Sequence, residues 1–265
     1  LGLCERAPAV FVTDAGEQPS KGVLAPATPV QVRDLVAGAQ LPDETAPDVA
    51  TPQLHVDRSD LVLLRRVGLV DPSSLHAYRA HDGYLALRRA IEMGPEAVVR
   101  EVLESKIMGR GGAAFPAGRK WDTVAHHPVR PHYLVCNADE SEPGTFKDRS
   151  IIEGDPFSLI EAMTIAAYAT GCERGYVYLR GEYPRAERTL RHAIAVAEEH
   201  GLLGDDVMGA GFSFHLEVFV GAGGGAGAGS AESTPSGGCV RIDQAGLNFG
   251  FAGPASASTF GARPE

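Results

Sequence analysis

The chain of 265 residues has few cysteines and contains no Cys-x-x-Cys pair. The four cysteines stand at positions 4, 136, 172 and 239, a spacing that does not suggest an iron–sulfur cluster held within this chain. Scattered cysteines are also more typical of a reducing compartment than of a disulfide-linked secreted domain. We therefore interpret Cys136, inside an apolar run, as a core residue.

Long apolar runs and an excess of positive charge are missing as well. The longest expected apolar helix, Phe157 to Thr170, contains Glu161 and is too short to span a bilayer. Against 24 Lys and Arg stand 34 Asp and Glu, and the net charge of -10 argues against nucleic-acid binding through a cationic surface. The adjacent His126 and His127 lack further ligands at a useful spacing, so they predict a surface turn rather than a metal site.

The most informative segment that is present is Met108 to Trp121, MGRGGAAFPAGRKW. Its glycines permit a ligand to approach the backbone closely. The preceding residues, Pro95 to Ile107, have apolar positions at helical spacing, so Gly109 is expected to end a helix. A dinucleotide fingerprint normally follows a strand, and taken alone this segment could equally be a glycine-rich turn that binds no ligand.

A second segment supports a ligand site. His132 to Asn137 (HYLVCN) predicts a buried parallel strand, and its C-terminal end opens into the acidic sequence ADESEPG. Ligands of open α/β sheets bind beyond such strand ends, where carboxylates can accept hydrogen bonds from ribose or ribityl hydroxyls and Lys120 can offset phosphate charge. The alternative is a solvated acidic turn paired with Lys147 and Arg149.

The rest of the pattern predicts an α/β domain with a largely parallel sheet, because strands alternate with helices. Arg180 and Glu182, at the end of one strand, are expected to be solvated. The expected strands are a short one in the first part of residues 61–93, then 132–137, 175–179 and 212–220. The expected helices are residues 83–93, 95–107, 157–170 and 184–200.

Three passages together carry a resemblance to a known family: GRGGAAFPAGRKW, HYLVCNADESEPGTFKDRSIIEGDP and GYVYLRGEYPRAERTL. They resemble the flavin-binding subunit of NADH-quinone oxidoreductase (respiratory complex I) and the related diaphorase subunits of NAD-linked hydrogenases and formate dehydrogenases. The resemblance runs from about Asp60 to Gly223. It implies a Rossmann-like domain that binds FMN and NADH and transfers hydride from the nicotinamide to the flavin.

Carried over residue by residue, the resemblance implies a catalytic role for Glu142, the acid beside the reacting ring. It places Phe115 against the nicotinamide or adenine. The residues that it implies around the flavin are Gly109, Arg110, Gly111, Gly112, Lys120, Asn137, Asp139 and Glu140, and the pattern also continues through Gly221 and Gly223. These roles are reasonable because the cofactor supplies the chemistry and the protein holds two rings face to face.

The pattern changes after Gly223. The family has a flavin-contacting tyrosine and then a glycine followed by two glutamates, whereas this chain reads GGAGAGS over residues 224–230. Residues 224–265 are rich in Gly, Ala, Ser and Pro, so we expect a disordered tail. A frameshift and a degenerate relative would both produce this change. A non-catalytic truncated or frameshifted remnant is therefore one alternative function.

The first residues resemble another subunit of the same enzymes. LGLCERAPAVFV is similar to the last cluster-binding segment of the thioredoxin-like [2Fe-2S] subunit, with Cys4 as the last metal ligand. We expect residues 1–38 to be its C-terminal fragment, ending in a helix with Pro29 in its first turn, and residues 39–58 to be a linker. Residues 59–223 would form the FMN/NADH-binding domain, followed by the tail 224–265.

The main functional prediction is the flavoprotein portion of an NADH dehydrogenase. NADH would reduce FMN, and electrons would pass on through the [2Fe-2S] and [4Fe-4S] clusters of the intact family member, which this chain alone does not support. Its partners would be other subunits of an NADH dehydrogenase or diaphorase complex, at the cytoplasmic side and peripheral to the membrane. The chain would thus be a fusion of two normally separate subunits. Because such a fusion resembles the diaphorases of soluble NAD-linked hydrogenases, a second alternative is a diaphorase subunit of an NAD-linked hydrogenase or formate dehydrogenase.

Overall fold

The computed structural model describes residues 8, 10–14, 20–24, 26–39, 58–109, 114–142, 144–221, 239–243 and 248–252. Within these residues the elements are, in chain order, β1 (Val10–Asp14), β2 (Ser20–Leu24), α1 (Pro29–Val36), η2 (Arg58–Asp60), α2 (Leu75–Ala80), α3 (Leu85–Met93), α4 (Pro95–Glu104), α5 (Ala117–Ala125), β3 (His132–Ala138), α6 (Lys147–Gly154), α7 (Pro156–Thr170), β4 (Cys172–Arg180), α8 (Pro184–Glu199), η3 (Val207–Gly209), β5 (His215–Gly221), β6 (Cys239–Asp243) and β7 (Asn248–Ala252).

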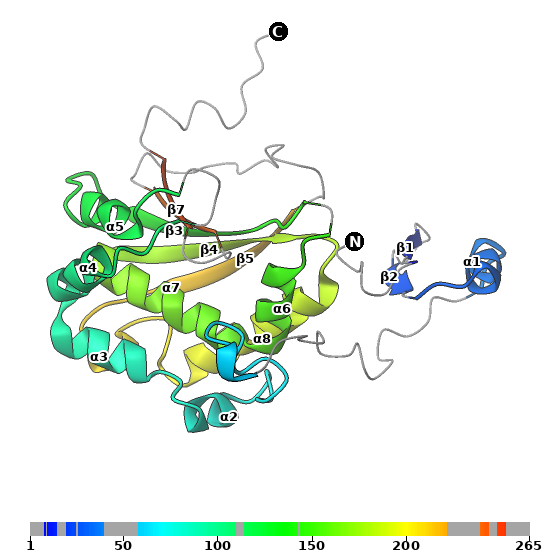
Figure 1. The fold of residues 1–265 in the computed structure, drawn as a ribbon, viewed down its shortest axis with the longest axis horizontal. Helices are drawn as coiled ribbons and strands as arrows, with labels where there is room; N and C mark the ends of the chain where they lie inside the picture. Colours follow the sequence, from blue (N-terminus) through cyan, green and yellow to red (C-terminus); the bar gives the residue numbers. More distant parts are fainter. Residues whose placement is uncertain are drawn as a thin grey trace, which may run out of the picture.

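A sheet in the order β5-β4-β3-β6-β7 forms the centre of the α/β domain (Figure 1). β3 pairs in parallel with β4 and β6, and β4 pairs in parallel with β5, whereas β7 runs antiparallel to β6. The register places the C-terminal ends of β3, β4 and β5 at one edge, since Ala138 pairs with Leu179 and Arg180 pairs with Gly221. The predicted α/β fold with a largely parallel sheet is confirmed.

One face of the sheet carries the core. Along β3, alternate residues from His132 to Ala138 are buried and the residues between them are half-buried, the period of two that a strand imposes. α7 contacts β3 and β4 on one side and α3 and α4 on another, and most of its residues are buried (Figure 1). Ile160 and Met163 of α7 are fully buried, and each such side chain contributes about 1.5–3 kcal/mol through burial.

The predicted helices agree closely with the structure, and differ mainly at their ends. The expected helix 95–107 ends as α4 at Glu104, where the Ser105 N–H donates to the carbonyls of Glu101 and Leu103. Gly109 therefore lies several residues beyond the helix. Three short helices, α2, α5 and α6, were not predicted.

The prediction of a short strand before the helix in residues 61–93 is wrong. Residues 62–70 form hydrogen-bonded turns, with the Val67 N–H donating to the Leu64 carbonyl at 3.1 Å and the Val70 N–H to the Arg66 carbonyl at 3.0 Å. Val67 is completely buried and packs against Gly154, where an added Cβ would lie 2.8 Å from a Val67 methyl group. The apolar run therefore supplies one core contact to α6 instead of pairing with the sheet.

The prediction of a disordered tail over residues 224–265 is wrong for two segments, which form β6 and β7. β6 pairs with β3 from Tyr133↔Cys239 to Asn137↔Asp243, and β7 pairs with β6. Their sequences, CVRID and NFGFA, contain the β-branched and aromatic residues that favour strands. The low overall apolar content of the tail concealed these two short segments.

The N-terminal part forms a small hairpin and a helix. β1 and β2 pair antiparallel from Val10↔Leu24 to Asp14↔Ser20. α1 begins at Pro29 as expected, with Thr28 and Gln31 forming a reciprocal capping box. The assignment of residues 1–38 to a thioredoxin-like unit and of 39–58 to a linker remains a prediction, and Cys4 lies outside the described residues.

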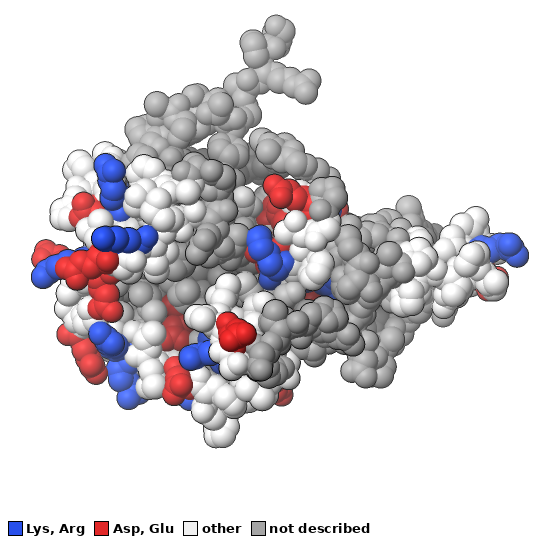
Figure 2. All heavy atoms as spheres, viewed as in Figure 1, with Lys and Arg blue, Asp and Glu red and all other residues white. Residues whose placement is uncertain are grey.

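No helix in the described part of the chain is long and apolar enough to cross a membrane. On the face seen in Figure 2, basic and acidic side chains are interspersed over the region of α3 and α4.

Candidate functional site

The glycine-rich segment is closed at its base by a short antiparallel bridge. Met108 bridges to Pro116, the Gly109 N–H donates to the Phe115 carbonyl at 2.8 Å, and the Ala117 N–H donates to the Ile107 carbonyl at 2.9 Å. The bridge holds the residues on either side of this segment next to each other. Arg110, Gly111 and Gly112 lie outside the described residues.

α5 begins directly after the bridge and brings two cations to its first turns. Phe115 is exposed, and the Lys120 Nζ lies 5.4 Å and the Arg119 guanidinium carbon 5.7 Å from the centre of its ring. A helix N-terminus with adjacent cations favours an anionic group, and a solvent-facing aromatic ring offers a surface for stacking. The structure thus brings the predicted residues Phe115 and Lys120 together.

α5 can lie close to α4 because residue 118 is glycine. A Cβ on Gly118 would come within 2.5 Å of the backbone of Leu103, a distance that no side chain tolerates. The sequence predicts that Gly118 lets a ligand approach the backbone. In the structure, Gly118 lets α5 pack closely against α4.

At the end of β3, two of the predicted residues contact each other. The Asp139 N–H donates to the side-chain oxygen of Asn137 at 3.2 Å, and both residues are half-buried. Glu142 is exposed, and its carbonyl accepts a hydrogen bond from the Thr145 N–H at 3.1 Å, which forms a turn. These residues face the sheet edge at which parallel α/β proteins bind ligands.

Glu140, in contrast, is buried and holds protein groups. Its carboxylate accepts hydrogen bonds from the Asp148 N–H at 3.0 Å, the Arg149 N–H at 3.4 Å and the Tyr183 hydroxyl at 3.1 Å, and Lys147 Nζ lies at 3.5 Å. The carboxylate therefore caps the N-terminus of α6. The interpretation of this segment as a solvated acidic turn is wrong for Glu140, although Lys147 is its partner as that interpretation expected.

Arg180 and Glu182 are not solvated as predicted. They form an ion pair with 2.9 Å between Arg180 Nε and Glu182 Oε2, and their side chains are mostly buried at 16% and 23% exposure. Arg180 also donates to the Glu140 carbonyl, which ties the end of β4 to the loop after β3. Burial disfavours the charged form of Glu182, but the hydrogen bond and charge of Arg180 outweigh it and lower the pKa of Glu182.

Burial and the nearby Glu140 carboxylate raise the pKa of Tyr183. Burial opposes the charge on Lys147, yet its hydrogen bond to Asp148 and the charges of Asp148 and Glu140 raise the pKa of Lys147. Sequence reasoning missed Tyr183 and Asp148 as members of this cluster. Little in the sequence indicates this cluster, because Tyr183 and Asp148 are related only by following the ends of β4 and β3.

Gly221, at the end of β5, lies in a space that only glycine fits. An added Cβ would be 2.7 Å from the Tyr178 hydroxyl oxygen, and a Cβ on Gly181 would collide with the Gly221 carbonyl oxygen. The two glycines let adjacent strand ends approach closely. Gly223 lies outside the described residues, so its predicted role is untested.

Within the described ranges no group of three or more His, Cys, Asp or Glu side chains could hold a metal ion. His126 pairs with Asp122 at 3.2 Å on the surface, and the His127 carbonyl accepts a hydrogen bond from the His132 ring. Cys136 is fully buried in the core, as expected.

Comparison with known families gives a match in the region that contains this site. Residues 102–226 match the family model described as the Nuo51 FMN-binding domain. This range contains the glycine-rich loop, α5, the strand-end residues and Gly221.

Known proteins similar to the chain have related names. It is 52% identical over 161 residues to the NADH-quinone oxidoreductase F-type subunit 2 of Rhizobium meliloti, a match that covers 60% of this chain and 38% of that protein. It is 45% identical to the corresponding F-type subunit of the NADH-quinone oxidoreductase of Aquifex aeolicus, over 64% of this chain and 39% of the relative. The NADP-reducing hydrogenase subunit HndC of Solidesulfovibrio fructosivorans is 46% identical, over 60% of this chain and 32% of that protein.

The chain thus spans less than two fifths of the length of these relatives. Among solved structures, an NAD⁺-reducing [NiFe]-hydrogenase in the H₂-reduced state is similar with a TM-score of 0.58 and 27% identity, covering 84% of this chain and 35% of the hydrogenase chain. The structural similarity therefore extends well beyond residues 102–226.

Proposed function

Because residues 102–226 match the family model of the Nuo51 FMN-binding domain, we propose that this chain supplies the flavin and NADH site of an NADH dehydrogenase flavoprotein. The observation that carries the proposal is that the bridge around the glycine-rich segment, the cationic start of α5 and the polar residues after β3 all fall within the matched range. When bound, FMN supplies the hydride acceptor for NADH.

The residues fit a flavin phosphate and ring system in two respects. Lys120 places a cation at the start of α5, and Phe115 presents an exposed ring for stacking. Asn137 and Asp139 offer an amide and a carboxylate for hydroxyl groups. Glu142, exposed beside them, would act next to the reacting ring.

Glu140 has a different role in this proposal. Its carboxylate holds α6, Lys147 and Tyr183, so it would act by positioning the loop 139–142 rather than by direct contact with the flavin. Arg180 supports the same loop through the Glu140 carbonyl.

We infer the partners and the location of this protein from the family resemblance. The complete protein would assemble with other subunits of an NADH dehydrogenase, pass electrons through iron–sulfur clusters, and lie at the cytoplasmic side as a peripheral component. The similarity to the hydrogenase subunit HndC and to an NAD⁺-reducing hydrogenase supports a diaphorase subunit as a second assignment. The sequence of residues 224–230, which lacks the tyrosine and paired glutamates of the family, supports the non-catalytic remnant.

An FMN titration of the purified chain, followed by quenching of flavin fluorescence, tests the proposal. We expect saturable binding that weakens about tenfold in Lys120→Gln, because a charge-assisted contact to phosphate is lost. Arg100→Gln, which removes one exposed positive charge from α4, is the matched control and should leave the affinity unchanged. Absence of saturable FMN binding would favour the remnant, whereas binding without reduction by NADH would separate the cofactor site from its activity.

A further inference from the structure

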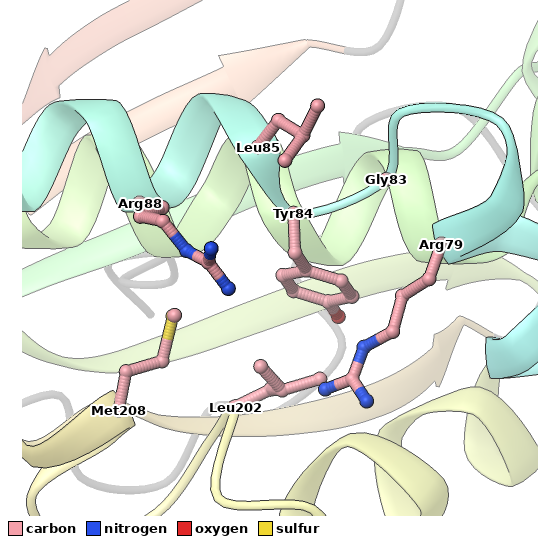
Figure 3. Close-up of a pocket in the computed structure, with 7 residues that line it drawn as sticks. All are labelled: Arg79, Gly83, Tyr84, Leu85, Arg88, Leu202 and Met208. Atoms are coloured by element: carbon pink, nitrogen blue, oxygen red, sulfur yellow. The ribbon is translucent and has the colours of Figure 1, made fainter.

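A pocket on the helical side of the molecule is separate from the proposed flavin site. It encloses about 300 Å³ and lies between the start of α3 and the turn around η3. Its lining combines two guanidinium groups, one phenol and an apolar wall; the residues are Arg79, Gly83, Tyr84, Leu85, Arg88, Leu202 and Met208 (Figure 3).

The Tyr84 hydroxyl group indicates that this pocket binds a ligand. Tyr84 is 4% exposed, and its hydroxyl oxygen is a buried polar atom for which the described structure provides no hydrogen-bond partner. In Figure 3 the hydroxyl points between the Arg79 side chain and Leu202, with Arg88 on the other side of the ring. An unpaired buried hydroxyl is unfavourable, and a bound acceptor would relieve it.

The orientation of this ring is fixed by a separate set of contacts. Tyr84 has a left-handed backbone conformation with φ of 63°, and its N–H donates to the buried Glu161 carboxylate at 2.8 Å. Glu161 also accepts from the Tyr78 hydroxyl at 2.6 Å and the Leu87 N–H at 3.0 Å. The negative charge of Glu161 is therefore satisfied by three donors on the backbone side of Tyr84.

The charge at the pocket favours an anion. Arg79 and Arg88 are exposed, and no carboxylate in the described ranges forms an ion pair with either guanidinium. Two acids near η3 have other partners: Asp206 Oδ1 accepts from the Gly211 N–H at 2.8 Å, and Asp205 lies 3.3 Å from His215. Two guanidinium groups and a phenol can all donate hydrogen bonds to an oxyanion. This set of donors suits carboxylate and phosphate oxygens.

We propose that this pocket binds a small organic oxyanion, with its charged group between Arg79, Arg88 and the Tyr84 hydroxyl and its hydrocarbon part against the apolar wall. Leu85, Leu202 and Met208 provide that wall, and a short aliphatic chain fits the volume. The site would bind independently of FMN, since none of its residues belongs to the glycine-rich loop or to the strand ends.

Isothermal titration of the full chain with butyrate and, separately, with inorganic phosphate tests the proposal, in chloride buffer of constant ionic strength. We expect saturable binding of butyrate that is tighter than that of phosphate, because only butyrate also contacts the apolar wall. Tyr84→Phe should weaken binding about tenfold through the lost hydrogen bond to a charged group, and Arg88→Gln by a similar factor.

Arg89→Gln is the matched control, because Arg89 is the adjacent exposed residue of α3, pairs with Glu101 at 3.6 Å and lies outside the pocket. Its affinity should equal that of the unaltered chain. Arg88→Gln changes an exposed side chain, so its folding is secure even if Tyr84→Phe alters the core. No saturable binding of butyrate, or equal affinity in all variants, would overturn the proposal, and tighter binding of phosphate would overturn the role of the apolar wall.

Discussion

At the scale of single residues, two buried carboxylates have the same structural task. Glu140 accepts from N–H groups in the first turn of α6, and Glu161 accepts from N–H groups at the start of α3. Each reaches its helix from a different element, so each joins two parts of the domain. The helix N-terminus supplies unpaired donors and a partial positive charge, which is why a buried carboxylate is tolerated there.

Glu140 and Glu142 stand two positions apart, but only Glu140 accepts hydrogen bonds from the first turn of α6. We expect Glu140→Gln to lower the free energy of unfolding by about 2–4 kcal/mol, because the amide NH₂ cannot accept the hydrogen bonds now made to one carboxylate oxygen. Glu142→Gln, at an exposed position, should change it by less than about 0.5 kcal/mol. Urea denaturation followed by circular dichroism measures both.

If Glu140→Gln left stability unaltered and only weakened FMN binding, Glu140 would contact the flavin directly, as the family resemblance implied. The two variants together therefore decide whether the buried acid positions the loop or binds the cofactor.

Buried tyrosines predict how stability depends on alkaline pH. Burial, followed by nearby carboxylates, raises the pKa of Tyr78, Tyr84 and Tyr183 above the ordinary value. A raised folded-state pKa means that the folded chain retains these protons longer than the unfolded chain. Their contribution is therefore complete below a pH of about 10 and is lost as the pH rises further.

We expect the free energy of unfolding to fall as the pH rises above about 10, with tyrosinate absorbance appearing together with unfolding. The raised pKa of Lys147 acts in the same direction. Tyr183→Phe should make the fall less steep because it removes one of the three groups. A stability that stayed constant or increased over this range would contradict the assignment.

At the scale of elements, close packing of α4 on α5 makes one substitution informative. Alanine normally stabilises a helix relative to glycine by about 1 kcal/mol. At Gly118 the sign should reverse, because the new Cβ would meet the Leu103 backbone at 2.5 Å. We expect Gly118→Ala to destabilise the chain by about 1–3 kcal/mol in thermal or urea denaturation.

Thr123→Ala, at an exposed position in the same helix, is the control. It improves helix propensity without a new contact and should leave stability equal or slightly higher. A stabilising Gly118→Ala would show that α4 and α5 separate easily, and that the glycine serves the loop rather than the helix contact.

The elements also show what sequence could predict. Apolar periodicity was sufficient for α4 and α8, and alternation for β5. α7 and β3 were predicted instead from apolar runs, bounded by Gly171 and by polar residues respectively. The apolar pattern failed for the residues near Val67, since a strand needs a neighbour to pair with and such a pattern does not reveal one. α6 is held by Glu140 and packs on α7 and α8, which are tertiary interactions that no local pattern encodes.

At the scale of the whole molecule, the sequence indicates residues for the candidate site, and their roles there stay predictions. In the structure Lys120 lies over the Phe115 ring, and Asp139 contacts Asn137. The burial of Glu140 and the ion pair of Arg180 with Glu182 could not be foreseen, because both depend on β4 and β3 ending side by side. Charged residues were assumed to be solvated, and here mutual pairing permits their burial.

The whole chain should bind FMN more weakly than a chain with the complete family pattern. The tyrosine and paired glutamates expected after Gly223 are absent from residues 224–230. Stacking and hydrogen bonds of this kind contribute roughly 1 kcal/mol each, so loss of a pair lowers affinity about tenfold or more. We therefore expect the chain to purify colourless, and to bind FMN only when the cofactor is added. The visible absorption spectrum after gel filtration, and the flavin released on heat denaturation, measure this directly. Stoichiometric flavin retained through purification, and bleached by NADH, would mean that Phe115, Lys120 and the strand-end residues suffice for tight binding.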